Sequence, residues 1–530
     1  YTLSGQAKRG GSFTCEIGAT DFEDTRSLKS ALGAAAGYRD PIFPGMAEHL
    51  APAIKILSGG NAEEYTRLER TGWYEGSFIA PGLEAERVTV SLNRRLPYRF
   101  DSEADLAQGL KGLDALVRFM GAECATPLLA FLFTAPFAHP ADLRNERAAM
   151  FIVGRSGTFK TSATQVAMSI YGASFTRDEM LLKWGEGATI NALMDFATRC
   201  ADVPMFIDNY KPNTASKGMY TTFTHAALEG GEKERLSKAS VLKDSRPIHT
   251  WPISTGEDMP TTDPASLARH LIIQMPRGGS VAALAEAQAQ ADSMNAIGRL
   301  WVEHLMSDQG RAQASAIRNG MFAGLRQDWI EYLGKSGKRL VNPYRIATNL
   351  AVNQMTWEAL MLHPALGEWA KQHVAAHIAG LRSIADNLVG STSNGLEANR
   401  FIEMLREVIA SGRGYLIPGK GTPIDKVPDP ALRARSIGWV DESGIYLFPQ
   451  AAIELIRSVS GDALGGVSSA TLYQQLKEID AIQGSDSGKL TKKVLIAGAR
   501  TTINTLWLKS GVLEELTEEE EDTREVIDAM

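Results

Sequence analysis

The chain has few cysteines and no long apolar run. Its 530 residues include 3 cysteines, Cys15, Cys124 and Cys200. They stand too far apart in sequence for a Cys-x-x-Cys site, and they are too few for a disulfide framework. No segment approaches the ~20 consecutive apolar residues of a membrane-spanning helix. These absences exclude a disulfide scaffold and a membrane partner, and we expect a cytoplasmic protein.

A strong net charge is also absent from most of the chain. The formal net charge is −7, but residues 514–530 hold nine acids and one arginine, so the remaining body carries +1. We expect an acidic, solvated tail, with mimicry of DNA in an empty channel as the alternative. A nearly neutral body can still carry a basic channel, so the net charge does not exclude a DNA partner.

The stretch AAMFIVGRSGTFKTSATQVAMSIYG, at 148–172, indicates a phosphate-binding loop. A buried strand, Met150 to Val153, leads into a glycine-bearing turn, and a helix starts near Lys160. In that arrangement backbone N–H groups and the positive end of the helix converge on an anion. Lys160 would reach the outer phosphates of ATP, and Thr161 would ligate Mg²⁺. The predicted nucleotide-binding residues are Gly154, Ser156, Gly157, Thr158, Phe159, Lys160, Thr161 and Ser162.

One position departs from the usual GxxxxGKT pattern. Phe159 stands where a glycine normally precedes the lysine, so the loop has the sequence GxxGxFKT. We expect a side chain there to narrow the phosphate cradle or to alter its backbone angles. Taken alone, the stretch is equally compatible with an ordinary strand, turn and helix, and the later segments favour the phosphate-binding loop.

A second apolar run, VPMFID at 203–208, ends in an acid. If its strand lies beside the Met150 strand in a parallel sheet, Asp208 can hold Mg²⁺ opposite Thr161. Asn209 follows, where many ATPases carry a second acid that orients the attacking water, and an amide cannot accept a proton. The pattern therefore predicts ATP binding more firmly than fast hydrolysis. The alternative is a core strand that ends in an Asp-Asn turn.

A third run, IHTWPI at 248–253, leads into Ser254, Thr255 and Glu257. A hydroxyl that leaves a neighbouring strand at this edge can contact the terminal phosphate or the attacking water. Ser254 or Thr255 is therefore the expected sensor. Glu257 is either the nearest spare carboxylate or part of a polar turn that closes the strand.

Arg269 precedes a fourth apolar run, HLIIQM at 270–275. An arginine just before a sheet-edge strand can project from the surface of a subunit. In a ring of subunits it could enter the neighbour's nucleotide site and neutralise the charge that develops on the transferred phosphoryl group. The alternative is a solvated surface arginine, and the sequence does not choose between the two.

The segment EGGEKERLSKASVLKDSRPIH, at 229–249, is dense in cations, and two short stretches within it could pair as a hairpin. Such a hairpin, facing the channel of a ring, would offer its basic groups to nucleic-acid phosphates largely independently of sequence. Acids in the same segment dilute its charge, so a solvated loop is the alternative. The predicted DNA-binding residues are Lys233, Arg235, Lys238, Lys243 and Arg246.

Together these segments resemble a known family. The series TGWYEG (71–76), TPLLAFLFTAPF (126–137), GRSGTFKT, FIDN, GGEKERLSK, STGED and ARH is similar to the helicase-like ATPase domain of mobile genetic elements and phages. That domain is similar to superfamily 3 helicases within the AAA+ class, and the resemblance covers roughly 68–305. It implies that Lys160, Thr161 and Asp208 bind ATP and Mg²⁺, that Ser254 or Thr255 is the sensor, that Arg269 acts in trans, and that the basic hairpin contacts DNA.

The fold class that follows is α/β: an AAA+ P-loop core with a parallel sheet, a β-rich N-terminal unit, a helical bundle and a C-terminal winged helix. Apolar spacing predicts helices over Val281–Met306, Gln313–Leu333, Arg345–Leu362, Glu368–Asn387 and Asn399–Ser411. The predicted domains are an N-terminal α+β domain (1–120), the ATPase core (121–280), a bundle or lid (281–411), a linker rich in Gly and Pro (412–430), the winged helix (431–513) and the tail (514–530).

Two smaller patterns have open interpretations. His373 and His377 fall on one helix face and could form half of a metal site, but no third ligand is near, which favours packing. GWVDESGIYLFP, at 438–449, is typical of a hairpin. With the helices and the basic segment that follow it, this hairpin favours a winged helix over a protein-docking domain. The predicted phosphate contacts there are Lys489, Lys492, Lys493 and Arg500.

The function expected from these observations is an ATP-dependent, ring-forming DNA helicase or translocase that serves replication of a mobile element or phage. Its partners would be single-stranded or forked DNA, further copies of the chain in a hexamer or other ring, and a possible primase. Two alternatives stay open: an oligomeric scaffold that binds ATP with slow or no hydrolysis, and an origin-binding initiator.

Overall fold

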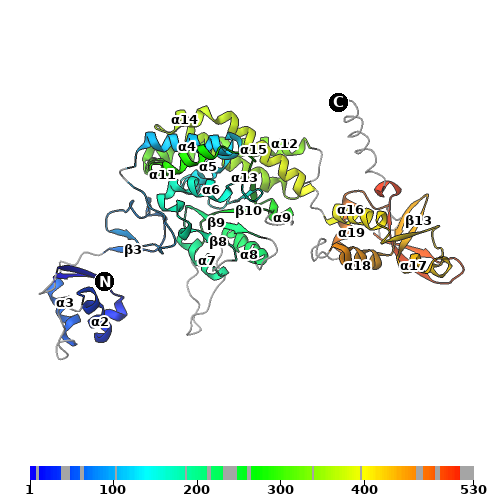
Figure 1. Ribbon diagram of the computed structural model, residues 1–530, viewed down its shortest axis with the longest axis horizontal. Coiled ribbons are helices and arrows are strands. Elements are labelled where there is room, and N and C mark those ends of the chain that lie inside the picture. Colours follow the sequence, from blue (N-terminus) through cyan, green and yellow to red (C-terminus); the bar gives the residue numbers. More distant parts are fainter. Residues whose placement is uncertain are drawn as a thin grey trace. The chain divides into compact units, whose positions relative to one another are not determined.

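The structure is a computed structural model, shown in Figure 1. It describes residues 1–6, 11–37, 48–59, 65–101, 104–185, 188–211, 216–230, 247–258, 264–336, 340–393, 397–460, 469–483 and 490–513. The chain divides into two compact units, one of residues 1–67 with 86–89 and the other of 68–85 with 90–530.

The first unit has a small core of its own. Strands β1 (Thr2–Gln6) and β2 (Ser12–Glu16) pair antiparallel, and three helices follow, α1 (Ala19–Glu23), α2 (Thr25–Ala35) and α3 (Leu50–Ser58). Asp24 caps α2, because its carboxylate accepts a hydrogen bond from the Ser27 N–H at 2.8 Å. Phe22 and Leu28 are buried between these elements.

A five-stranded parallel sheet lies at the centre of the second unit. Its strands are β7 (Ala149–Val153), β8 (Leu182–Lys183), β9 (Pro204–Tyr210), β10 (Trp251–Gly256) and β11 (His270–Gln274), in the order β11-β7-β10-β9-β8. Because the strands are buried on both faces, they are continuous apolar runs in the sequence. The four predicted strands are confirmed. The expectation that β9 lies beside β7 is wrong, since β10 pairs with both of them.

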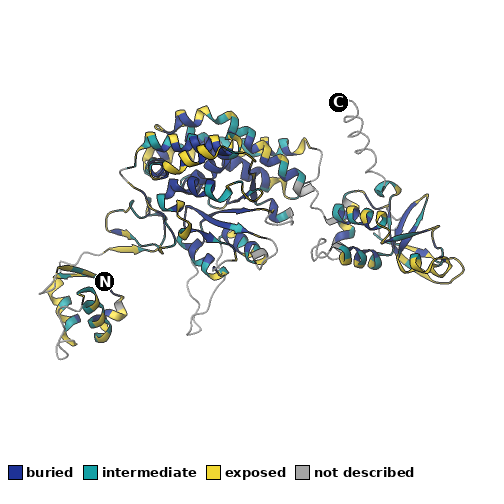
Figure 2. Ribbon diagram, viewed as in Figure 1, coloured by how far each residue is buried: buried dark blue, intermediate teal, exposed yellow. Residues whose placement is uncertain are grey.

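Helices cover both faces of this sheet. Figure 1 shows α5 (Ala122–Phe137) and α6 (Lys160–Met168) on one side, and α7 (Ile190–Arg199) and α8 (Ser216–Glu229) on the other, while the short α9 (Pro264–Leu267) precedes β11. Helix α5 is buried along nearly its whole length, as Figure 2 shows for the centre of this unit. Of the helices in the described ranges, none is long and apolar enough to cross a membrane.

Four of the five helices predicted for the bundle are confirmed there, two of them broken. The fifth, Asn399–Ser411, is present but packs against helices of the C-terminal part instead. Val281–Met306 forms two helices separated at Gln290, and the predicted Glu368–Asn387 helix is divided at His373. The helices are α4 (Leu106–Met120), α10 (Val281–Ala289), α11 (Ala291–Met306), α12 (Asp308–Gly334), α13 (Pro343–Met361), α14 (Gly367–Gln372) and α15 (Val374–Ser393). His377 is fully buried and stacks on Trp357, with ring centroids 4.6 Å apart, so this histidine packs in the bundle.

Short strands precede the bundle, in agreement with the predicted β-rich N-terminal unit. They are β3 (Thr66–Leu68), β4 (Gly72–Tyr74), β5 (Ser77–Ile79) and β6 (Val88–Val90), of which β4 and β5 form a hairpin. Short 3₁₀ helices are η2 (Ser169–Tyr171), η3 (Ala173–Thr176), η4 (Asp178–Met180), η5 (Ile424–Lys426) and η6 (Ser510–Leu513).

The C-terminal part contains a second five-stranded sheet, in the order β12-β13-β14-β16-β15. The predicted 438–449 hairpin is confirmed as β13 and β14. Strand β12 lies within 412–430, the segment that composition marks as a linker, and pairs parallel with β13. The elements are α16 (Glu397–Ala410), β12 (Tyr415–Pro418), α17 (Pro430–Ala434), β13 (Ser436–Asp441), β14 (Gly444–Leu447), α18 (Pro449–Ser460), α19 (Ser469–Glu478), β15 (Lys492–Leu495) and β16 (Thr502–Leu508).

Candidate nucleotide-binding site

The loop between β7 and α6 has the backbone of a tight turn. Gly157 has φ +81°, and Phe159, the residue before α6, is left-handed with φ +58° and ψ +28°. A Cβ atom at Gly154 would lie 3.0 Å from the Met275 Cβ and 3.1 Å from the Thr158 hydroxyl, so a side chain there would crowd the loop. The left-handed conformation costs a non-glycine residue about 1–2 kcal/mol.

The Phe159 side chain contacts the end of α4. Its ring is 45% exposed and meets the Phe119 ring edge-on, with the ring centroids 6.3 Å apart. Phe159 therefore holds an aromatic side chain in a backbone conformation that glycine adopts without strain.

Lys160 lies over the loop. Its ammonium group donates hydrogen bonds to the Gly154 carbonyl at 2.6 Å and to the Arg155 carbonyl at 2.9 Å. Burial lowers the pKa of the Lys160 ammonium, and the carboxylates of Glu257 and Asp208 act in the opposite direction. The cation is thus placed at the centre of the turn, with two acids close enough to stabilise its charge.

Asp208, on β9, lies beside Thr161 in the first turn of α6, although β9 and β7, the strand that leads into α6, are not neighbours. The Thr161 hydroxyl donates a 2.8 Å hydrogen bond to Asp208 Oδ1, and the Thr255 hydroxyl donates to the same oxygen. Asp208 is 6% exposed. A hydroxyl and a carboxylate at the edge of a site are oxygen donors of the kind that Mg²⁺ takes, together with waters and phosphate oxygens.

The two sensor candidates point in opposite directions. Thr255 contacts Asp208, and its hydroxyl also accepts a 3.4 Å hydrogen bond from the Asn209 N–H. Ser254 faces the other side of the sheet, where its hydroxyl accepts a 3.1 Å hydrogen bond from the Trp184 indole. Because side chains alternate along a strand, only one of the two can face the loop.

Arg269 lies at the other edge of the sheet. Its carbonyl accepts a hydrogen bond from Ala149, the first residue of β7, whereas the loop follows the last residue of β7. Four residue steps along a strand span about 13 Å. Arg269 contacts His225 Nε2 at 3.2 Å and Glu229 at 3.4 Å. Within one chain it is therefore not brought together with Lys160.

The five predicted DNA-binding residues lie outside the described residues. Lys233, Arg235, Lys238, Lys243 and Arg246 all fall between α8 and β10. Of the phosphate contacts predicted for the C-terminal segment, Lys489 also lies outside the described residues, Lys492 and Lys493 lie on β15, and Arg500 lies in the turn between β15 and β16. Among the residues the structure describes, no three histidines, cysteines or acids gather as a metal site, and His373 has Asp114 at 3.8 Å.

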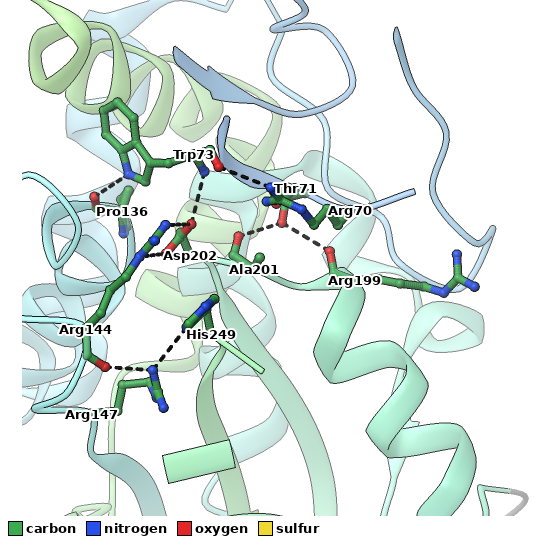
Figure 3. Close-up of polar contacts among 10 residues, drawn as sticks. All are labelled: Arg70, Thr71, Trp73, Pro136, Arg144, Arg147, Arg199, Ala201, Asp202 and His249. Atoms are coloured by element: carbon green, nitrogen blue, oxygen red, sulfur yellow. Dashed lines mark hydrogen bonds and ion pairs between the residues drawn. The ribbon is translucent and has the colours of Figure 1, made fainter. Parts of the chain in front are cut away.

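A buried polar network that sequence reasoning missed lies at the amino-terminal edge of the sheet (Figure 3). Asp202, in the turn before β9, is 1% exposed. Its carboxylate accepts hydrogen bonds from Arg144 Nε at 3.0 Å, from Arg144 Nη2 at 2.7 Å and from the Trp73 N–H at 3.0 Å. The charge of a buried carboxylate is stabilised by a paired arginine and further hydrogen-bond donors. Asp202 therefore fixes the positions of the segments that carry Arg144 and Trp73.

This network explains the TGW sequence at 71–73. The Thr71 hydroxyl donates to the Ala201 carbonyl at 2.9 Å, and the Trp73 indole donates to the Pro136 carbonyl at 2.9 Å (Figure 3). A Cβ atom at Gly72, which has φ +100°, would lie 2.6 Å from Asp202 Oδ2. Only glycine fits between these contacts.

Arg147 and His249 extend the network. Arg147 is 3% exposed and donates to the carbonyls of Ala227, Leu228 and Arg144, while its Nη1 lies 3.2 Å from His249 Nδ1 (Figure 3). Burial lowers the pKa of Arg147 to about 10, although the Asp202 carboxylate raises it. Burial, together with the nearby arginines, lowers the pKa of His249 to about 4. His249 is therefore neutral near pH 7.

Comparison with known proteins bears on the fold. No protein-family model and no curated protein matches the chain. The chain is similar to a solved structure described as "SCCmec type IV Cch - active helicase", with a TM-score of 0.65 and 15% identity, covering 97% of this chain and 92% of that one. For the "A form apo structure of NrS-1 C terminal region-CTR" the TM-score is 0.27, at 12% identity over 68% of this chain and 85% of that one, too low to indicate a shared fold. The chain therefore has a helicase-like fold.

Proposed function

We propose that this protein is an ATP-dependent DNA helicase or translocase of the AAA+ class that works as a ring and serves replication of a mobile element or phage. The observation that carries the proposal is the convergence of Lys160, Thr161 and Asp208 at the carboxyl edge of a parallel sheet. A strand order with β10 between β7 and β9 also supports it, because it places the Thr255 hydroxyl on Asp208.

In this proposal the residues of the loop hold the nucleotide. Lys160 binds the outer phosphates, after its ammonium leaves the Gly154 and Arg155 carbonyls, and Gly157 and Phe159 give the turn its anion-facing backbone. Thr161 and Asp208 hold Mg²⁺, which supplies charge neutralisation at the phosphates. Thr255 orients Asp208, and Glu257, which is exposed near Lys160, is the carboxylate available to a water.

The ring completes the site. Arg269 lies at the opposite edge of the sheet from the loop of its own chain, so it can serve only the nucleotide of a neighbouring copy. A guanidinium supplied in trans stabilises charge on the transferred phosphoryl group. In the free chain Arg269 pairs with Glu229, and assembly of the ring would replace this contact with one to the neighbour's nucleotide.

We propose two DNA-contacting elements. The basic hairpin at 233–246 grips one strand inside the ring. The C-terminal part supplies a winged helix, because helices α18 and α19 lead directly into the antiparallel β15–β16 hairpin and α16 packs against both helices. Lys492 and Lys493 lie on the hairpin.

A specific observation favours slow hydrolysis as the second candidate. Phe159 and Asn209 both adopt left-handed backbone conformations at the positions where the loop and the β9 strand face the site, and neither is the residue that fast ATPases use there. The same fold would then act as a nucleotide-gated oligomeric scaffold.

Steady-state ATP hydrolysis and unwinding of a forked DNA test the proposal. We expect DNA-stimulated hydrolysis and unwinding by the full chain, and neither by Lys160→Ala. ATP binding with no hydrolysis in the presence of DNA would favour the scaffold, and sequence-specific binding of duplex DNA with no unwinding would favour an initiator.

A further inference from the structure

A second cationic site lies at the edge of the sheet opposite the loop. A cleft of about 460 Å³ opens there, between the start of β7, the end of α8, the residue before β11 and the start of α13. Its charged lining consists of Arg147, Arg269, Arg345 and Glu229. Arginines therefore outnumber acids, although the chain as a whole is acidic.

Arg147 and Arg345 have different roles in this cleft. Arg147 is almost fully buried, and carbonyl oxygens occupy most of its donors, so it supports the wall. Arg345 is 28% exposed at its side chain and is anchored through a 2.6 Å hydrogen bond from Nη2 to the Arg147 carbonyl. Its Nε is buried and has no hydrogen-bond partner among the described residues.

Arg345 is held close to a like charge. Burial lowers the pKa of Arg345, the Arg269 cation lowers it further, and Glu146, 3.9 Å away, raises it. Arg269 pairs with Glu229 at 3.4 Å, and Glu146 lies near Arg345, so carboxylates offset part of the repulsion between the two guanidinium groups. An anion bound between the two cations would offset the rest. The free chain therefore holds these two side chains in a geometry that an anion would stabilise.

The helix that carries Arg345 adds to this field. Helix α13 begins at Pro343, and Asn342 before it makes no side-chain cap. The positive end of this 19-residue helix therefore opens toward the cleft that Asn342 lines. Asn145 contributes an amide to the same lining.

We propose that Arg345 is a second trans-acting cation, which binds, together with Arg269, the terminal phosphates of a nucleoside triphosphate held by the neighbouring copy of the chain. The inference rests on the proposed function, since it requires the ring. A compact cleft of this volume suits the phosphates of one small molecule. A nucleic-acid backbone would need an extended groove of cations.

The test uses the full chain and four single variants: Arg345→Ala, Arg345→Lys, Lys160→Ala and the control Arg311→Ala. Arg345→Ala should lower DNA-stimulated ATP turnover about 10²-fold, the usual effect of losing one transition-state donor. The affinity of the unassembled chain for ATP should stay unchanged, because Arg345 contacts only the neighbour's nucleotide. Arg345→Lys should recover part of the loss. Arg311→Ala, which removes a surface arginine paired with Asp308, is the matched control and should behave as the wild type.

Subunit mixing distinguishes a trans role from a structural one. Arg345→Ala subunits keep an intact loop, and Lys160→Ala subunits keep intact arginines, so a mixture should regain turnover that neither variant has alone. Loss of activity in Arg345→Ala without rescue in the mixture would overturn the proposal, because a structural defect is not repaired by a neighbour. Wild-type turnover in Arg345→Ala would also overturn it.

Assembly provides a readout that does not depend on hydrolysis. With a non-hydrolysable ATP analogue, the protein concentration needed for ring formation should rise at least tenfold in Arg345→Ala. If the wild type assembles but does not hydrolyse ATP, that rise still supports the inference while the motor function fails. If Arg345→Ala instead fails to bind single-stranded DNA in the absence of nucleotide, the cleft binds the phosphates of DNA and the inference is wrong. A wild type that neither assembles nor hydrolyses ATP contradicts both proposals.

Discussion

Replacing Asp202 by asparagine should destabilise the core at the amino-terminal edge of the sheet. Asparagine keeps the size of the side chain and one acceptor oxygen, so the hydrogen bond from the Trp73 N–H can survive. With the amide oxygen at the Oδ2 position, which accepts from the Trp73 N–H and from Arg144 Nη2, the amide N–H₂ group takes the Oδ1 position and faces the Arg144 Nε donor. Both bonds to Arg144 cannot then be made.

The magnitude follows from the burial of the pair. Removing one partner of a buried ion pair costs about 3–5 kcal/mol. Asp202 is 1% exposed, but the Arg144 side chain is 30% exposed and can regain water. We therefore expect a loss near the lower end, about 3 kcal/mol in the unfolding free energy. At about 2 °C per kcal/mol for a large domain, the melting transition of the core should fall by about 5 °C or more.

Asp142→Asn is the matched control. Asp142 and Asp202 have similar left-handed backbones, with φ +52° and +56°, but Asp142 is exposed. Calorimetry of the full chain should show several transitions, so hydrogen exchange of the 71–79 peptide is measured as well. Asp202→Asn should lower the core transition and speed exchange in that peptide, while Asp142→Asn should stay within about 0.5 kcal/mol of the wild type. Equal behaviour of the two variants would refute this account of the network.

Three further predictions concern pH, magnesium and DNA. Burial lowers the pKa of His270 to about 4 and that of His377 to about 3, so below about pH 6.5 the unfolded chain binds more protons than the folded chain. Melting temperatures should therefore fall as the pH drops from 6.5 toward 4, and they should fall less in His377→Leu. A melting temperature that does not change over this range would contradict the burial of neutral histidines. Thr161→Ala should raise the Mg²⁺ concentration required for ATP binding about tenfold. Thr164→Ala is the control and should leave this concentration unchanged, because the Thr164 hydroxyl bonds to the Lys160 carbonyl inside α6. Equal Mg²⁺ titrations for the two variants would remove Thr161 from the metal site. Charge reversal at Lys238 and Lys243 should weaken single-stranded DNA binding and reduce its salt dependence without changing ATP affinity, and unchanged DNA binding would dispose of the hairpin as the contact.

Much of the sheet could be predicted from the sequence because its strands are continuous apolar runs. Strands β7, β9, β10 and β11 have this signal, and the acid near the end of β9 and the hydroxyls near the end of β10 are visible in the sequence. Strand β8, Leu182–Lys183, is too short to show a pattern. The position of β10 between β7 and β9 is also invisible, because strand order depends on pairing between segments far apart in the chain.

The Asp202 network and the Arg345 cleft could not be predicted for a related reason. Asp202 follows Ala201 in a turn, where an acid is ordinary, and only its distant partners Arg144 and Trp73 make it buried and paired. The sequence marks Arg345 only as the start of a predicted helix. The breaks at Gln290 and His373 were missed because neither contains the proline or glycine that usually ends a helix.

The most direct test of the central claim is a titration of the wild type and of Lys160→Ala with Mg²⁺ and a non-hydrolysable ATP analogue. Since Lys160 is the cation at the centre of the β7–α6 turn, we predict saturable binding by the wild type and no measurable binding by the variant. Equal affinity of the two proteins would show that nucleotide does not bind at this turn.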